Sequence, residues 1–435
     1  MTALAHRPAL ASLALACLLL STGAQAAGEL VIDRQEAKKG KPALTLAPRD
    51  ASLGTLFVRF HVGAFDDDQE YGRTRFTQRA LVDGNAALGA EFLEDLYAER
   101  ATLEIRTGLR ECAFVLTAPK ASFSKLSTRL LKGLMSPSID KKLFDRARRL
   151  TLDDQHLGGG LATIITMVAG AVLLTEVSKG GGDYRNPPFG DRTSVVALKQ
   201  RDLERHAKTY FVPGNASIAA VGPVDKKLKK ALKKLRGGDR NEVKRGDIAG
   251  LPRELERWSP REMHLHAQVL ELTTAKEVAV TRVLESLVYD RMMWRLRWKG
   301  VTYGPYVGVH PYDWLDLLVI FVPVSNSRER GVRVEPLLRE YLDQLIVDVN
   351  DEDFMASREH VVGRMLQIDN RPVELAEALM RQNRRISWHD DEVLKAVRGL
   401  TKDEFLSAVR QWLGPERSIN YLFGRSRAKY ERRSR

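Results

Sequence analysis

The sequence predicts an α+β protein made of two homologous halves, each a mixed or antiparallel β-sheet covered on one face by helices. Two observations lead to this prediction. Residues 198–222 and 400–424 align without a gap, at an offset of 202 residues (198 to 400, 222 to 424). In the first half, the hydrophobic pattern changes from strand to helix to hairpin to helix. That order is typical of helices laid over one face of a sheet.

The repeated segment closes each half. Each copy has an amphipathic helical pattern, then a turn that contains proline, then an alternating strand pattern that ends in glycine. Because self-similarity at a fixed spacing indicates duplication, we infer that the two halves share one fold. The matched pairs are Leu198 with Leu400, Leu203 with Phe405, Tyr210 with Trp412, Pro213 with Pro415, and Gly222 with Gly424.

Other segments of the first half also have clear periodicity. Residues 54–65 (GTLFVRFHVGAF) are predicted to form a strand, 72–83 a helix, 101–119 a hairpin and 122–135 a helix. The apolar run 161–175 has 15 residues. Crossing a bilayer takes roughly 20, so a buried helix is expected, with an interfacial or partner-facing helix as the alternative.

Composition sets the domain boundaries. Residues 1–26 have a basic start, an apolar centre and an Ala-Gln-Ala end, the pattern of a secretory signal peptide. Residues 27–236 are predicted to form the first α+β domain and 263–424 the second. Residues 237–262 between them are charged, rich in Gly and Pro, and lack apolar periodicity, which predicts a linker. Residues 425–435 form a basic tail.

Cysteine use fits an exported chain that is stabilised by its core. Cys17 lies within the predicted signal, so Cys112 remains alone and no internal disulfide can form. Cys112 lies in an alternating apolar run and is expected to be buried. We expect export, with the periplasm of a Gram-negative bacterium as the compartment.

The formal net charge of +13 comes mainly from the tail and from residues 226–236, KKLKKALKKLR. Such a basic stripe can bind nucleic acid or anionic lipid. Leu228, Leu232 and Leu235 recur at helical spacing, however, so we expect a packed helix with a solvated lysine face. We predict no nucleic-acid partner.

Residues 57–85, FVRFHVGAFDDDQEYGRTRFTQRALVDGN, resemble the start of the inverzincin peptidases, the group of pitrilysin, insulinase and mitochondrial processing peptidase. That group has a strand, an acidic loop and Gly-x-x-His-x-x-Glu-His before a second glycine. The resemblance covers the whole mature chain. Residues 187–222 are similar to the family's Pro-Tyr-Gly loop, helix and strand, and residues 300–308 to its Gly-Leu-Ala-Tyr turn. It implies a processing-peptidase-like metallohydrolase fold.

The resemblance places Arg75, Gln78 and Arg79 at the positions of the family's His, Glu and His. In the family, two histidines one turn apart bind Zn²⁺ and the glutamate is the general base for the bound water. Arginine has only donors and a permanent charge, and Gln78 cannot accept a proton as a carboxylate does. The resemblance therefore implies a chain with no catalytic residues, no metal and no other cofactor.

The family's third ligand, a glutamate some 75 residues further on, falls at Asp154, which is 75 positions after Arg79 (79 to 154). A carboxylate remains at this position while two cations replace the histidines. We therefore expect Asp154 to form an ion pair with Arg75 and Arg79 in place of a metal site.

In the family, the second half holds the backbone of the substrate with an Arg and a Tyr seven residues apart. Tyr303 matches the tyrosine, but the position seven residues earlier is Leu296, with Arg295 and Arg297 on either side. Tyr303 and Arg297 are therefore the candidate substrate-binding residues, with Arg295 as the alternative to Arg297.

Few other residues in the sequence are candidates for a catalytic or metal site. His264 and His266 would face the same side of a strand and could ligate a metal, but no third ligand lies nearby in the sequence. The acidic stretch 65–70 is expected to be a solvated loop before the helix.

The resemblance and the lost motif imply a non-catalytic subunit that completes the chamber of a two-chain zinc peptidase and holds its substrate. The expected partner is a zinc-peptidase homologue with an intact motif, in a heterodimer, and the expected ligand is a peptide or an unfolded protein. The alternative is a metal-free clamshell homodimer that binds peptides, like a chaperone. Membrane association through the tail or the apolar run is compatible with either.

Overall fold

The structure is a computed structural model, and it describes residues 31–424 apart from 69, 90, 109, 158–177, 180–189, 191, 242–246, 249–253, 259–262, 271, 303, 312–315, 324–333, 369–370, 381, 384–385, 388–390 and 414–417. Four sequence predictions lie outside the described residues: the signal 1–26, the apolar run 161–175, Tyr303 and the tail 425–435. No helix among the described residues is long and apolar enough to cross a membrane.

The first half contains a six-stranded mixed sheet with the strand order β1-β2-β7-β3-β5-β4. Its strands are β1 (Asp33–Gln35), β2 (Ala43–Pro48), β3 (Leu53–Phe60), β4 (Thr102–Thr107), β5 (Cys112–Pro119) and β7 (Ala216–Gly222). Its helices are α2 (Arg73–Asp83), α3 (Glu91–Ala98), α4 (Lys120–Met135), α5 (Lys141–Leu157), α7 (Arg192–Ala197), α8 (Gln200–Tyr210) and α9 (Lys226–Lys234), with short 3-10 turns η2 (Ala64–Asp67) and η3 (Pro213–Asn215). The β2–β7 pair is parallel and the other pairs are antiparallel.

The core of the first half lies between this sheet and its helices. Leu56, Val58 and Phe60 of β3 are fully buried on the helix side, where Phe60 packs against Phe211 with ring centroids 4.9 Å apart. The intervening Phe57 is also buried, on the opposite face. Because both faces of β3 are covered, its sequence is a nearly continuous apolar run rather than a clean alternation.

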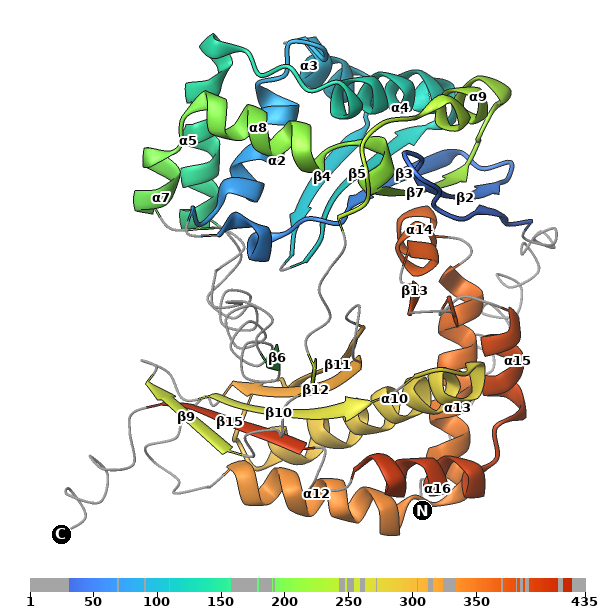
Figure 1. Cartoon of the computed structure of the whole chain (residues 1–435). Coiled ribbons are helices and arrows are strands. Elements are labelled where there is room, and N and C mark those ends of the chain that lie inside the picture. Colours follow the sequence, from blue (N-terminus) through green and yellow to red (C-terminus); the bar gives the residue numbers. More distant parts are fainter. Residues whose placement is uncertain are drawn as a thin grey trace, which may run out of the picture.

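A helix of the second half covers that opposite face. In α14 (Pro372–Met380), Leu375, Ala376, Leu379 and Met380 pack against the sheet. The sheet residues in this cluster are Ala47, Phe57, Ala113, Val115, Ala219 and Val221. Figure 1 shows α14 beneath the first sheet, between the upper and lower halves of the molecule. The expectation that helices cover one face was therefore incomplete, because periodicity shows that α14 is amphipathic but not which sheet it packs on.

The second half contains a five-stranded sheet with the order β11-β12-β10-β15-β9. Its strands are β9 (Glu254–Trp258), β10 (Met263–Leu270), β11 (Tyr306–Pro311), β12 (Asp316–Pro323) and β15 (Ser418–Gly424). Its other helices are α10 (Ala275–Trp298), α12 (Val334–Asp348), α13 (Asp351–Ile368), α15 (Asp391–Gly399) and α16 (Lys402–Trp412). Two small two-stranded sheets pair β6 (Ser178–Lys179) with β8 (Asp247–Ile248) and β13 (Gln382–Asn383) with β14 (Ile386–Ser387).

The two halves repeat one topology, as the sequence predicts. Helices α8 and α16 have the same bounds at the offset of 202 residues (200 to 402), and so do strands β7 and β15 (216 to 418). Each of these strands also makes the parallel pair of its sheet, β7 with β2 and β15 with β9.

The predicted linker 237–262 is wrong at both ends. Residues 254–258 form β9, the edge strand of the second sheet. An edge strand needs one row of backbone hydrogen bonds and tolerates charge, so this segment lacks the apolar pattern of a central strand. At the other end, Gly237 bonds to Gly40 and Gly214, and Asn241 donates to the carbonyl of His61, so this stretch belongs to the first half.

Candidate functional site

Helix α2 carries the predicted site and is held at its first turn and along its apolar side. It starts after Gly72, whose φ of 91° lies in the left-handed region that favours glycine. The side chain of Asp67 accepts hydrogen bonds from the backbone N–H groups of Gly72 (2.9 Å) and Thr74 (2.8 Å), which satisfies donors of the first turn. On its apolar side, Phe76 packs against Phe144 of α5 with ring centroids 5.2 Å apart.

Asp154 of α5 joins the two arginines of α2, as the sequence analysis expects. Arg75 Nη2 donates to Asp154 Oδ2 at 2.6 Å, and Arg79 donates from Nε to Oδ2 (2.9 Å) and from Nη2 to Oδ1 (2.8 Å). Arg79 also lies 3.5 Å from a carboxylate oxygen of Asp83. Two guanidinium groups therefore face two carboxylates, and three N–H groups occupy the oxygens of Asp154.

The pKa shifts follow from this geometry. Burial alone would raise the pKa of Asp154, but the hydrogen bonds from Arg79 and the charges of both arginines outweigh it and lower the pKa. Burial lowers the pKa of Arg75 while Asp154 opposes the change. Asp154 is thus held ionised as the counter-charge of the pair, which leaves it unsuited to take up a proton near neutral pH.

Gln78 is fully buried and forms hydrogen bonds with two strands of the first sheet. Its amide nitrogen donates to the carbonyls of Arg106 and Ala113, both at 3.2 Å, and its oxygen accepts from Thr107 Oγ1 at 2.5 Å. Both ends of the amide are used, so Gln78 ties α2 to the β4–β5 hairpin.

Arg75 also covers the open edge of strand β4, which is an edge strand of the first sheet. In an antiparallel hairpin, hydrogen-bonded and non-hydrogen-bonded residue pairs alternate. Since Gly108 N donates to Glu111 O, Ile105 falls in a non-hydrogen-bonded pair, and its carbonyl points away from β5. Arg75 Nη1 donates to that carbonyl at 2.9 Å. An open edge can pair with an extended peptide, and Arg75 occupies it at Ile105.

These residues do not fit a zinc ion. Guanidinium groups offer no lone pair, their positive charge repels a dication, and the Asp154 oxygens already accept three hydrogen bonds. Among the described residues, no group of three or more His, Cys, Asp or Glu side chains is placed to hold a metal ion.

His264 and His266 lie on β10, and both are buried. His266 Nδ1 is 2.7 Å from Asn420 Oδ1 of the neighbouring strand. Burial lowers the pKa of His266, opposed by its hydrogen bonds. The structure gives these two histidines no carboxylate ligand among the described residues, so the pair does not form a zinc site there.

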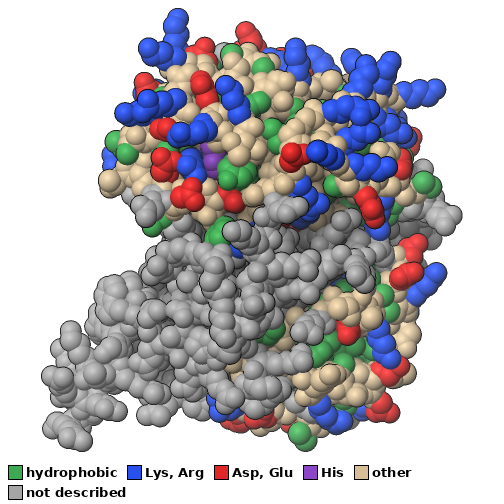
Figure 2. Space-filling view, in the orientation of Figure 1, with side chains coloured by type: hydrophobic (Ala, Val, Ile, Leu, Met, Phe, Trp, Pro, Cys, Tyr) green, Lys and Arg blue, Asp and Glu red, His purple; other side chains and the backbone are tan. Residues whose placement is uncertain are grey.

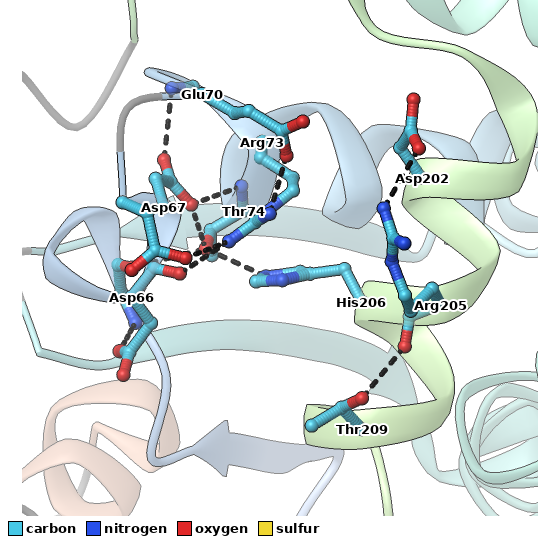
Figure 3. A network of polar contacts seen from close by, with 12 residues as sticks. Asp66, Asp67, Glu70, Arg73, Thr74, Asp202, Arg205, His206 and Thr209 are labelled. Carbon is cyan, nitrogen blue, oxygen red and sulfur yellow. Dashed lines mark hydrogen bonds and ion pairs between the residues drawn. The ribbon is translucent and has the colours of Figure 1, made fainter.

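A buried polar network next to the site was missed by sequence reasoning (Figure 3). The stretch 65–70 was expected to be solvated, yet Asp67 is fully buried, and burial raises its pKa to about 7 despite hydrogen bonds from Thr74 and Gly72. Thr74 Oγ1 lies 2.6 Å from Asp67 Oδ1 and 3.0 Å from Nε2 of the buried His206. This network joins the loop, α2 and α8. A run of three aspartates gives no signal of which one turns inward.

In the second half, the two candidate arginines differ in environment. Arg295 is partly buried, donates to Gln344 Oε1 and lies over the ring of Tyr341 at 5.2 Å, so it packs α10 against α12. Leu296 is fully buried, and Arg297 is exposed. This difference favours Arg297 over Arg295 as a substrate contact. Tyr303, as noted, lies outside the described residues.

Solved structures of M16-like peptidases share this fold. A protease from Helicobacter pylori matches with a TM-score of 0.73 at 11% identity, over 91% of this chain and 100% of the other. A peptidase M16 inactive domain from Pseudomonas fluorescens matches with a TM-score of 0.71 at 15% identity, over 91% and 98%. The periplasmic protease PqqL from Escherichia coli matches with a TM-score of 0.68 at 12% identity, over 93% of this chain and 49% of PqqL.

No protein-family model matches the sequence, and no curated protein matches it either. The structural similarities nevertheless extend over nine-tenths of the chain. The protein has the fold of the M16-like peptidases, which confirms the α+β fold that the resemblance to the inverzincins implied.

Proposed function

We propose that this protein is a non-catalytic peptidase homologue that pairs with a zinc-carrying homologue, completes its chamber and holds its substrate. The observation that carries the proposal is the ion pair of Asp154 with Arg75 and Arg79 on a peptidase fold. At the positions that would hold metal and base, this chain has two fixed cations, a fully bonded amide and an ionised carboxylate. Such a site stabilises the fold but offers neither a Lewis acid nor a general base.

The proposed pairing is supported by a longer structural neighbour of the same fold. One structural neighbour, PqqL, is about twice as long as this chain, which matches 49% of it. PqqL therefore has a further region of similar extent beyond the part that matches this chain, and we propose that the zinc-carrying homologue takes the place of that region here. A neighbour described as an inactive M16 domain has nearly the same extent as this chain, which aligns with 98% of it.

The substrate-holding role is assigned to the second half. In the first half, Arg75 covers the edge of β4 at Ile105, which leaves that point closed to an extended peptide. In the second half, Arg297 is exposed near the end of α10, a few residues before Tyr303. We propose that Arg297 and Tyr303 contact the backbone of a bound peptide, and that the chain acts in the periplasm after removal of residues 1–26.

Copurification tests the pairing. The tagged chain, isolated from its native cell envelope under mild salt, should carry one homologue of similar length with an intact His-x-x-Glu-His, in a one-to-one complex by gel filtration. Isolation of a homodimer alone would contradict the proposal and would favour the peptide-binding clamshell instead.

The purified chain by itself should bind no stoichiometric zinc and cleave no peptide, because the ligand positions hold arginine. Metal analysis after dialysis measures this directly. About one tightly held Zn²⁺ per chain would show that ligands other than Arg75, Arg79 and Asp154 form a site.

Arg297→Ala should lower kcat/KM of the reconstituted pair by roughly threefold to tenfold, the usual effect of losing one hydrogen bond of about 0.5–1.5 kcal/mol. Tyr303→Phe should have a similar effect. Arg295→Ala is the matched control, since Arg295 packs against Gln344 and Tyr341, and it should lower thermal stability without slowing turnover. Normal turnover by the Arg297 and Tyr303 variants in an intact complex would rule out the holding role.

A further inference from the structure

Helix α9 presents a lysine face whose position is fixed by the core beneath it. Asp225 caps the helix, since its Oδ1 accepts from Leu228 N at 2.7 Å and from Ser124 Oγ of α4 at 2.9 Å. Leu228 and Leu232 are fully buried in the core of the first half, and Leu235 is partly buried against it. The apolar side of α9 therefore packs against the core of the first half, and its basic side faces outward.

The outward side carries only positive charge. No acidic residue lies between Lys226 and Arg236 in the sequence. Within the described parts of the chain, none of the α9 lysines forms an ion pair, and all are exposed except the half-buried Lys229. Lys125 and Lys132 of the adjacent α4 are also exposed. Figure 2 shows Lys and Arg side chains gathered over α9 and the neighbouring end of α4. The α9 lysines are Lys226, Lys227, Lys229, Lys230, Lys233 and Lys234.

This arrangement differs from an ordinary solvated helix face, on which both signs of charge are interspersed. Like charges three and four residues apart destabilise a helix, and α9 contains several such pairs. The cations are also nearly all lysine, a strongly hydrated point charge, rather than arginine, whose planar group recognises individual phosphates. These lysines are therefore better suited to non-specific electrostatic attraction to an extended anionic surface than to recognition of a single phosphate.

We propose that the lysine face of α9 docks the protein on a bilayer surface rich in anionic phospholipid. The contact is purely electrostatic, because Leu228 and Leu232 are held in the core and cannot insert into the bilayer. The segment from Asp225 to Asn241 has no aromatic side chain that could stack on a base, which disfavours single-stranded nucleic acid as the occupant. An envelope location, expected from residues 1–26, would place the chain beside such a surface.

The test is sedimentation of the full mature chain with vesicles of phosphatidylcholine that contain about one-third phosphatidylglycerol. Each lysine near an anionic surface contributes about fivefold to partitioning. The variant Lys229→Gln, Lys230→Gln, Lys233→Gln, Lys234→Gln lacks four of them and should therefore bind roughly 600-fold more weakly. Glutamine keeps the helix propensity of lysine. Binding should also disappear on pure phosphatidylcholine, and in about 0.5 M salt, where screening is strong.

The control variant removes the same charge from exposed positions of the second half, through Arg364→Gln, Lys395→Gln, Arg398→Gln and Arg410→Gln. It should bind like the unmodified chain, and so should a chain that ends at Gly424. Equal loss of vesicle binding in both four-residue variants would show an effect of net charge alone and would overturn the proposal.

Two other outcomes would also overturn it. If removal of residues 425–435 abolishes vesicle binding while the α9 variant still binds, the tail is the docking element. Displacement from vesicles by duplex DNA at equal phosphate concentration would mark a general polyanion surface, which also overturns it.

Discussion

Asp154→Asn is expected to lower the free energy of unfolding by about 3 kcal/mol near neutral pH. The substitution removes the carboxylate that accepts hydrogen bonds from Arg75 and Arg79. It leaves one buried and one partly buried cation without this counter-charge. Among the described residues, Asp83 would remain 3.5 Å from Arg79. Chemical denaturation followed by circular dichroism measures the loss.

Asp153→Asn is the matched control, since Asp153 is the adjacent exposed carboxylate and should change stability by less than about 0.5 kcal/mol. The pH dependence gives a second check. The folded pKa of Asp154 lies below its unfolded value, so its contribution is complete above roughly pH 4 and is lost as the pH falls through the folded pKa. Equal stability of the two variants at pH 7 would contradict the ion-pair interpretation.

The second large effect is a gain of metal binding. The triple variant Arg75→His, Gln78→Glu, Arg79→His should bind about one Zn²⁺ per chain, because two imidazoles one turn apart would then face Asp154. It should raise the melting temperature when zinc is added. Calorimetric titration with zinc and thermal unfolding with and without the metal measure both.

Zinc alone should not restore catalysis in the triple variant. The resemblance to the inverzincins implies that Asp154 stands where the family has the longer glutamate, and that the buried Leu296 stands where it has an arginine. Turnover also needs a substrate held in register. Efficient peptide cleavage by the triple variant without a partner would show that this chain is complete apart from its motif. Failure to bind zinc at all would show that Arg75 and Arg79 do not occupy ligand positions.

Sequence reasoning predicted the features that depend on local pattern and on charge. The repeat predicted that the two halves share one fold, because the amphipathic helix, the turn and the strand recur together at one offset, but it did not predict the order of the strands. The resemblance to the inverzincins implied that Asp154 lies beside both arginines, and their opposite charges then predicted the ion pair that the structure contains.

The missed features depend on contacts between distant segments. The docking of α14 on the first sheet joins residues such as Leu375 and Val115, which no periodicity connects. The inward turn of Asp67 is set by the amides of Gly72 and Thr74, and the neighbouring aspartates look identical in sequence. The different roles of Arg295 and Arg297 depend on which side of α10 meets α12.

We propose above that this chain completes a zinc-carrying partner. The most direct measurement is peptide turnover by the purified partner as this chain is titrated into it. We predict that turnover rises from near background to a plateau at one chain per partner, and that the Asp154→Asn chain, once folded, follows the same curve because its ion pair is structural. If the partner alone already cleaves the peptide at its full rate, and adding this chain does not change that rate, the proposal is contradicted.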